Sequence, residues 1–387
     1  MLRERDKDYF YMRRALALAA RARGRTSPNP MVGAVIVSQE RIVGEGYHQR
    51  AGTPHAEVHA LRQAGEKARG ATLYVNLEPC CHFGRTPPCC EQIIAAGIRR
   101  VVAAMEDPNP QVAGKGIKRL REAGVEVECG VLEEEARRLN EAFFKFITAG
   151  RPFVVLKAAV SLDGKIATAS GESMWITGEA ARTEAHRLRN TYDAVMVGIG
   201  TVLKDNPQLT TRLPAGEEGR DAVRVVVDSR LRLPLNARVI NPASPAPLLV
   251  ATTEQAPRER LELLERQEGV EVLCFSSRDG QVPLGELMEE LGKREICSVL
   301  LEGGATLNAS ALKEGIVDKV VVFMAPRIIG GTEAPGMVGG SGCARLSDAW
   351  KLEEVSFSPV GEDIMLVGYL AKKASGRKGG GLCSRAL

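Results

Sequence analysis

The chain has 387 residues, of which 44% are hydrophobic and 26% charged, and its net charge is +4. This composition is typical of a folded protein of two domains, and it excludes a wholly disordered, fibrous or membrane-embedded chain. Residues 371–387 hold five basic and no acidic side chains, so the rest of the chain carries a net charge of −1. A body with so little charge argues against nucleic-acid binding, and we expect residues 371–387 to form a disordered basic tail.

The N-terminus shows no signal-peptide core, and no apolar run in the sequence reaches the roughly 18 residues of a membrane span. We therefore expect a cytoplasmic protein without a membrane partner, in a compartment where thiols stay reduced. In that setting the nine cysteines favour metal binding or catalysis over disulfides.

Residues 1–150 alternate between helix and strand patterns. Helices are predicted over residues 8–23, 55–64, 89–96, 117–123 and 133–146, and strands over 31–37, 71–77, 99–105 and 125–129. This alternation predicts a mainly parallel sheet covered on both faces. The breaker Gly150-Arg151-Pro152 then places a domain boundary after residue 150.

Residues 151–370 repeat the α/β alternation without repeating the sequence of the first half. Strands are predicted over residues 153–160, 194–197, 223–227, 248–251, 271–275, 298–301, 319–324 and 364–369, and helices over 179–189, 258–266, 284–291 and 305–313. We therefore expect a second α/β domain.

Three fragments of the first half point to a metal site: His55-Ala56-Glu57, Pro79-Cys80 and Pro88-Cys89. Two thiolates and one imidazole leave a fourth tetrahedral position for water, as in catalytic zinc sites, where zinc makes that water a nucleophile at neutral pH. Glu57 is the candidate proton shuttle. H-x-E followed by P-C-x-x-C is the signature of zinc nucleobase deaminases, and here its second part is stretched to C-x8-C.

Other interpretations of these residues are weaker. An all-thiolate structural site would need both members of Cys80-Cys81 and of Cys89-Cys90, whose neighbouring side chains diverge. A metalloprotease helix would need Glu directly after His55, where Ala56 stands. We favour Cys80 and Cys89, which both follow Pro, and leave open whether Cys81 or Cys90 competes for the metal.

Two glycine-rich turns in the second half are candidate nucleotide sites. Gly198-Ile199-Gly200 contains G-x-G, but Leu203 takes the place of the third glycine, so a dinucleotide fingerprint is not supported. Glu302-Gly303-Gly304 follows a predicted strand and opens a helix, where free backbone N–H groups can hold a phosphate. An ordinary tight turn explains this segment equally well.

Longer runs resemble a known family, the bifunctional deaminase/reductases of riboflavin biosynthesis. The resemblance to its deaminase domain lies in residues 26–33, 78–91 and 107–116. The resemblance to its reductase domain lies in residues 157–165, 173–177, 205–212, 227–229 and 302–304. The resemblance covers roughly residues 6–370. The family pattern has Ser at the position of Cys81.

The resemblance implies two folds and two activities. Residues 1–150 would form a cytidine-deaminase-like three-layer αβα domain, and residues 151–370 a dihydrofolate-reductase-like α/β domain. The first would use zinc to deaminate 2,5-diamino-6-(5-phosphoribosylamino)pyrimidin-4(3H)-one by hydrolysis. The second would use NADPH to reduce the ribosyl side chain, giving 5-amino-6-(5-phosphoribitylamino)uracil.

The resemblance also assigns residues. His55, Cys80 and Cys89 would bind zinc, and Glu57 would shuttle protons. The NADPH contacts would be Ala159, Trp175, Thr201, Asp205, Ser229, Gly304, Ala305, Thr306, Leu307, Asn308, Ala309 and Ser310. The substrate contacts would be Ser173, Arg189, Leu209, Arg212 and Glu302 in the reductase, and Asn29, His48 and Arg85 in the deaminase. For the proton donor of the reductase, Asp205 and Glu302 are the candidates.

The expected partner is a small phosphorylated pyrimidine, and a homo-oligomer is expected. A tRNA-type deaminase with an appended nucleotide-binding domain is the alternative, but it would need a basic, aromatic-lined groove, which an aromatic content of 4% disfavours. A metal-stabilised binding module would tolerate the loss of Glu57. A chain with one decayed site would keep a single activity.

Overall fold

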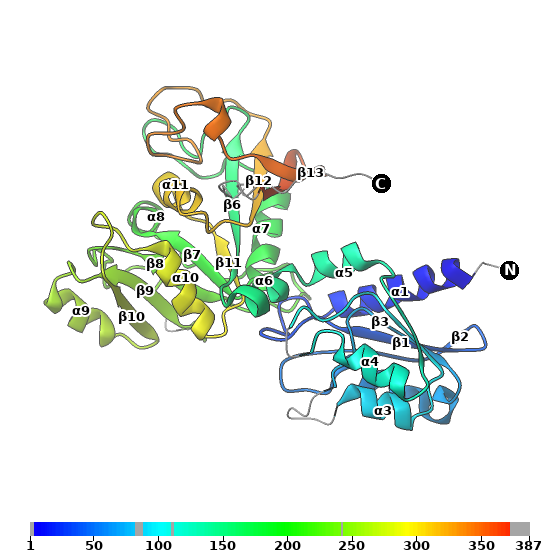
Figure 1. Ribbon diagram of the computed structural model, residues 1–387. Coiled ribbons are helices and arrows are strands. Elements are labelled where there is room, and N and C mark those ends of the chain that lie inside the picture. The colour runs from blue at the N-terminus through cyan, green and yellow to red at the C-terminus, as the bar shows by residue number, and fades with distance from the viewer. Residues whose placement is uncertain (1–3, 82–87, 110–111, 241–242, 372–387) are drawn as a thin grey trace, which may run out of the picture.

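Two separate β-sheets organise the chain in the computed structural model (Figure 1). The structure describes residues 4–81, 88–109, 112–240 and 243–371. Arg85 and the basic tail beyond Ala371 lie outside these ranges. No helix within them is long and apolar enough to cross a membrane.

The first sheet has five strands in the order β2-β1-β3-β4-β5. The strands are β1 (Gly33–Ser38), β2 (Arg41–Tyr47), β3 (Thr72–Val75), β4 (Arg100–Ala103) and β5 (Glu126–Cys129). Strand β1 pairs antiparallel with both β2 and β3, whereas β3, β4 and β5 are parallel. The prediction of a mainly parallel sheet is therefore wrong for this half, since β1 is antiparallel to both of its neighbours. The predicted elements did not include the β1–β2 hairpin.

Helices cover both faces of this sheet, which confirms the three-layer αβα fold. The helices of this half are α1 (Glu4–Ala20), α2 (Ala56–Ala64), η1 (Gly65–Ala68), α3 (Cys89–Ala95), α4 (Lys115–Glu122), α5 (Glu133–Leu139) and α6 (Glu141–Ala149). Helices α1 and α5 pack on one face through Met12, Ala15 and Ala136. Helices α2 and α3 pack on the other through residues such as Ala60 and Ile93. The single helix predicted over 133–146 is two helices, broken at Asn140.

The second sheet has nine strands in the order β10-β9-β8-β7-β11-β6-β12-β14-β13. The strands are β6 (Phe153–Ser161), β7 (Ala194–Gly198), β8 (Val223–Val227), β9 (Leu248–Thr253), β10 (Val270–Phe275), β11 (Ser298–Leu301), β12 (Lys319–Ala325), β13 (Leu352–Val360) and β14 (Asp363–Leu370). Strands from β10 to β12 are parallel, and β14 and β13 continue the sheet antiparallel. The carboxyl ends of the parallel strands meet at one edge, where ligands bind in open α/β sheets.

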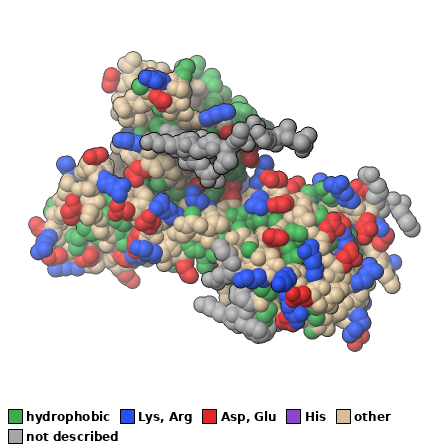
Figure 2. All heavy atoms as spheres, in the orientation of Figure 1, with side chains coloured by type: hydrophobic (Ala, Val, Ile, Leu, Met, Phe, Trp, Pro, Cys, Tyr) green, Lys and Arg blue, Asp and Glu red, His purple; other side chains and the backbone are tan. Residues whose placement is uncertain are grey.

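Helices flank this sheet on both sides. They are α7 (Glu179–Thr191), α8 (Ile199–Asp205), α9 (Arg258–Glu265), α10 (Leu284–Lys293), α11 (Ala305–Lys313) and the short η2 (Leu346–Asp348). Helices α10 and α11 bury Leu287 and Leu312 against one face, while α8 and α9 bury Val202 and Leu264 against the other. Helix α6 lies between the two halves (Figure 1). Acidic and basic side chains are intermixed over both halves of the face in Figure 2.

Candidate active sites

One candidate site gathers a histidine and two cysteines in the first half. His55 directly precedes α2, Cys80 follows β3, and Cys89 is the first residue of α3. Their ligand atoms all lie within 4.8 Å of one another. The distance from His55 Nδ1 to the Sγ atom is 3.3 Å for Cys89 and 3.6 Å for Cys80. Two helix N-termini thus direct their side chains to one point, where the helix dipoles favour thiolate.

Close packing of α2 on β2 places His55. A Cβ on Gly46 would meet the Ala56 carbonyl oxygen at 2.4 Å, so only glycine at this position lets the start of α2 approach the strand so closely.

The donor set of this cluster fits zinc. Hydrogen bonding with Cys89, and then with His55, lowers the pKa of the Cys80 thiol well below its ordinary value. A thiolate at Cys80 is the form that a metal needs. Two sulfur atoms and one imidazole nitrogen are the donors of catalytic zinc sites that keep one position open.

Cys81 and Cys90 stand apart from the cluster. Cys90 is fully buried, and its thiol donates to the carbonyl oxygens of Pro79 at 3.3 Å and Gly116 at 3.6 Å. Cys81 is half-buried, and burial raises its pKa. Of the four neighbouring cysteines, the structure brings only Cys80 and Cys89 to His55.

Glu57 is a buried carboxyl group beside this cluster. The side chain is 3% exposed and lines a cavity of about 350 Å³ that also reaches His55 and Cys80. Burial raises its pKa, and Oε2 has no hydrogen-bond partner among the described residues. A buried carboxyl group with a raised pKa and a free oxygen is suited to proton transfer.

Asn29 and His48 line the same cavity. Asn29 Nδ2 lies 3.2 Å from His48 Nε2, while His48 Nδ1 lies 3.2 Å from the Pro54 carbonyl oxygen. The ring of His48 meets the ring of His55 edge-on, with centroids 5.5 Å apart. The structure therefore brings together Asn29 and His48, the two predicted substrate residues of this half that lie in the described ranges.

Part of this cavity wall was absent from the sequence prediction. Phe143, Phe146 and Ile147 reach it from α6, and Glu295 reaches it from the second half. The aromatic cluster in Glu141–Ala149 is visible in the sequence, but nothing local indicates which cavity it faces.

A second candidate site lies at the carboxyl edge of the nine-stranded sheet. A cavity of about 540 Å³ there is lined by these predicted residues: Ala159, Ser173, Trp175, Arg189, Thr201, Asp205, Arg212, Glu302, Gly304 and Asn308. An adjacent cavity of about 390 Å³ is lined by Ser229, Thr306, Leu307 and Ser310. The turn at residues 198–201 and the start of α11 border both cavities.

Three predicted residues of this half line neither cavity. Leu209 is 2% exposed and packs in the core against α8 and α9. Ala305 packs against Gly339 and Ala309 packs against Gly340, so closely that a Cβ on either glycine would contact the facing alanine. These positions can support the site through the backbone, but their side chains do not reach the space where a ligand would bind.

A buried charge cluster forms the floor of the larger cavity. Glu302 accepts two hydrogen bonds from Arg189, both 2.7 Å long, and Lys157 Nζ lies 4.0 Å from its carboxylate. Burial would raise the pKa of Glu302, yet the two cations outweigh it and lower that pKa to about 2. Glu302 is therefore ionised at neutral pH and cannot donate a proton.

Lys157 and His186 also line this cavity, although neither was assigned a role from the sequence. Burial lowers the pKa of Lys157 and lowers that of His186 to about 4. For Lys157 a signal was present, because it is the one charged residue in the otherwise apolar strand Phe153–Ser161.

Trp175 and Asp205 frame the mouth of the cavity. Trp175 is 62% exposed, and the guanidinium of Arg182 sits 4.7 Å from its ring centroid. Ser173 donates a hydrogen bond of 3.0 Å to the carboxylate of Asp205. An exposed aromatic face of this kind suits stacking against a flat ligand.

Comparisons with known proteins agree with both sites. Residues 5–105 match the cytidine and deoxycytidylate deaminase zinc-binding region, and residues 152–366 match the RibD C-terminal domain. Riboflavin biosynthesis protein RibD of Aquifex aeolicus is 48% identical over 95% of this chain and 99% of that protein. The RibD of Actinobacillus pleuropneumoniae is 47% identical over 93% and 94%.

Solved structures show the same arrangement of both halves. Acinetobacter baumannii RibD superposes with a TM-score of 0.84 at 40% identity, covering 95% of this chain and all of the other. A diaminohydroxyphosphoribosylaminopyrimidine deaminase/5-amino-6-(5-phosphoribosylamino)uracil reductase from Thermotoga maritima gives 0.82 at 39%, again over 95% and 100%. The chain therefore belongs to the RibD family, the bifunctional zinc deaminases and NADPH reductases of riboflavin biosynthesis.

Proposed function

We propose that residues 1–150 deaminate 2,5-diamino-6-(5-phosphoribosylamino)pyrimidin-4(3H)-one and that residues 151–370 reduce the ribosyl side chain of the product. The final product would be 5-amino-6-(5-phosphoribitylamino)uracil. The observation that carries the proposal is the cluster of His55, Cys80 and Cys89 at a cavity that His55 and Cys80 line together with the buried carboxyl group of Glu57. The name of the Thermotoga maritima relative supports the choice of substrates.

In the deaminase, His55, Cys80 and Cys89 would hold zinc. Bound zinc supplies an activated water as the nucleophile for hydrolysis. Glu57 would take a proton from that water at its free Oε2 atom and pass it to the leaving amine. Its raised pKa suits a group that must both accept and donate.

Asn29 and His48, which line the same cavity as Glu57, would bind the pyrimidine. An amide and an imidazole offer donors and acceptors to the ring edge.

In the reductase, NADPH would occupy the two adjacent cavities, since the residues assigned to it are divided between their linings. When bound, NADPH would supply the hydride for reduction at the anomeric carbon of the ribosyl group. One proton must enter to balance that hydride. Lys157 is the proposed donor, because burial lowers its pKa and Glu302 is already ionised.

Four single serine variants test the zinc assignment. Cys80→Ser and Cys89→Ser should lose both bound zinc, measured by atomic absorption, and ammonia release from the diaminopyrimidine. Cys81→Ser and Cys90→Ser are matched controls, because each replaces the neighbouring thiol, and they should keep both properties. Zinc retained by the first pair, or a zinc-loaded wild-type enzyme that releases no ammonia, would overturn the proposal.

A small pyrimidine substrate suits the family. The absence of nucleic-acid and membrane partners, a homo-oligomeric state and a cytoplasmic location stay predictions from the sequence. Size-exclusion chromatography with light scattering would test the oligomeric state.

A further inference from the structure

Residues 24–31 belong to the loop that joins α1 to β1, and this part of the loop presents Pro28, Asn29 and Pro30 to the deaminase cavity. Inside the first half, the loop is held by a backbone hydrogen bond of 2.8 Å from Asn29 to Thr26, by the contact of Asn29 with His48, and by Asn76 Nδ2, which donates to the Met31 carbonyl oxygen at 3.0 Å. Further anchors come from residues beyond the first sheet.

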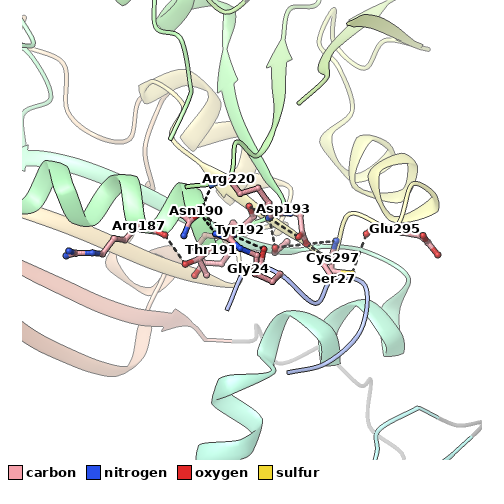
Figure 3. A network of polar contacts seen from close by, with 12 residues as sticks. Gly24, Ser27, Arg187, Asn190, Thr191, Tyr192, Asp193, Arg220, Glu295 and Cys297 are labelled. Carbon is pink, nitrogen blue, oxygen red and sulfur yellow. Dashed lines mark hydrogen bonds and ion pairs between the residues drawn. The ribbon is translucent and has the colours of Figure 1, made fainter. Parts of the chain in front are cut away.

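The beginning of the loop is fastened to the reductase half (Figure 3). Arg25 donates from both terminal nitrogens to Asn190 Oδ1, each at 3.2 Å, and Ser27 Oγ donates to Asp193 Oδ2 at 2.9 Å. At Gly24 a Cβ would meet the Asn190 carbonyl oxygen at 2.3 Å. The two backbones therefore touch at this point.

On the reductase side of this contact, further hydrogen bonds hold Asp193 and Asn190 in place. Asp193 is 9% exposed, and its Oδ2 also accepts hydrogen bonds from Ser298 Oγ at 2.9 Å and from the Cys297 backbone N–H at 3.1 Å. Asn190 Oδ1 accepts a further bond of 2.8 Å from the backbone N–H of Arg220. The corner between α7 and β7 therefore holds Asp193 and Asn190 in fixed places for the loop.

The end of the loop is fastened to the segment that links the two halves. Met31 donates its backbone N–H to Asn140 Oδ1 at 2.8 Å, and Asn140 Nδ2 donates back to the Met31 carbonyl oxygen at 2.9 Å. Asn140 is 2% exposed and stands between α5 and α6. Helix α6 then brings Phe143 and Phe146 to the same cavity. One wall of the deaminase cavity is thus built against the linker and the reductase.

We infer that the reductase half positions the substrate-binding loop of the deaminase through the Ser27–Asp193 and Arg25–Asn190 contacts. Ser27 and Arg25 are positioning residues: neither lines the cavity, and they act by fixing Asn29. The inference rests on the proposed function of that cavity. A hydrogen bond to a charged group is worth about tenfold in an equilibrium constant, so loss of either contact raises the deaminase KM by about tenfold.

The test uses Ser27→Ala and Arg25→Ala in the full-length, zinc-loaded enzyme. The deaminase KM should rise in both, with kcat, zinc content and melting temperature close to wild type. The KM of the reductase for the deaminated pyrimidine should not change. Ser27→Thr retains the hydroxyl donor and should retain the wild-type KM.

Matched controls come from the β1–β2 hairpin of the same half. Ser38 and Arg41 pair with each other across that hairpin, and Ser38→Ala and Arg41→Ala should leave both activities unchanged.

Three results would overturn the inference. The deaminase KM could stay at the wild-type value in Ser27→Ala and Arg25→Ala, while the wild-type enzyme deaminates normally. The reductase could weaken in parallel with the deaminase, which would mean that the contacts only stabilise the fold. The Ser27→Thr variant could be as defective as Ser27→Ala. A wild-type enzyme without deaminase activity would instead refute the proposed function, and the inference with it.

Discussion

Arg189 and Arg212 both line the reductase cavity, and their hydrogen bonds predict opposite consequences for their alanine variants. The Arg189 side chain is 14% exposed. Its guanidinium donates two hydrogen bonds of 2.7 Å to the Glu302 carboxylate and one of 3.1 Å to the Thr210 carbonyl oxygen. Arg212 is exposed and donates one described side-chain bond, to Thr210 Oγ1. We therefore expect Arg212 to bind the substrate phosphate and Arg189 to hold Glu302.

The magnitudes follow from these contacts. A hydrogen bond between charged groups contributes about 1.5–3 kcal/mol, so Arg212→Ala should raise the KM for the phosphorylated substrate roughly 10- to 150-fold and leave stability unchanged. Arg189→Ala leaves the buried Glu302 carboxylate without its main partner. Breaking a buried ion pair lowers the free energy of unfolding by about 3–5 kcal/mol. Because Lys157 Nζ, 4.0 Å from the Glu302 carboxylate, still offers it a positive charge, we expect a loss near the lower limit.

Tryptophan fluorescence measures this stability change directly. The two tryptophans of the chain, Trp175 and Trp350, both lie in the reductase half, so urea unfolding followed by their emission reports that half. Reductase kinetics with phosphorylated and dephosphorylated substrate give the second measurement. The reasoning is refuted if Arg212→Ala raises the KM for both substrates equally, or if Arg189→Ala unfolds at the same urea concentration as wild type.

Three further predictions concern single residues. Glu57→Gln should lower the deaminase kcat by about 10²- to 10⁴-fold with unchanged zinc content and reductase activity; a loss in ammonia release below tenfold would contradict its role as proton shuttle. His186 should titrate by NMR near the pKa of about 4 that burial gives it. Because the unfolded chain takes up this proton from about pH 6.5, the free energy of unfolding should fall on acidification from pH 6.5 to 4, and fall less in His186→Asn. Arg230 lines the smaller reductase cavity, so Arg230→Ala should weaken calorimetric binding of 2′,5′-ADP but not of 5′-AMP, and equal weakening of both would argue against recognition of the 2′-phosphate.

The metal cluster could be predicted because each ligand sits in a short motif whose chemistry is local. His55 and Cys89 begin helices, and both thiols follow Pro. The choice between Cys89 and Cys90 needed the structure, since both stand in one helical turn and only the backbone decides which thiol faces His55.

The structural features that could not be predicted lack the local sequence patterns that normally indicate a turn, a strand or a helix end. The β1–β2 hairpin turns at Gln39 and Glu40, which both adopt positive φ without the Asn-Gly or Asp-Gly pair that indicates such turns. Strand β13 is mostly exposed, so it shows no apolar pattern from which a strand could be predicted. The break at Asn140 serves a contact with Met31, which lies far away in sequence.

The contacts between the halves could not be predicted at all. Ser27 and Asp193 are separated by 166 positions, and neither sequence neighbourhood indicates the other. The same holds for Lys157 and Glu302, which meet because β6 and β11 are neighbouring parallel strands.

If the proposed function holds, one chain deaminates the pyrimidine and then reduces its ribosyl group. The most direct measurement follows ammonia release and NADPH oxidation together, with the zinc-loaded enzyme and the phosphorylated diaminopyrimidine as the sole pyrimidine. We expect equal amounts of both, and in Glu57→Gln the loss of both, with NADPH oxidation restored when the deaminated pyrimidine is added. Oxidation of NADPH without ammonia release, or ammonia release without any oxidation of NADPH, would contradict it.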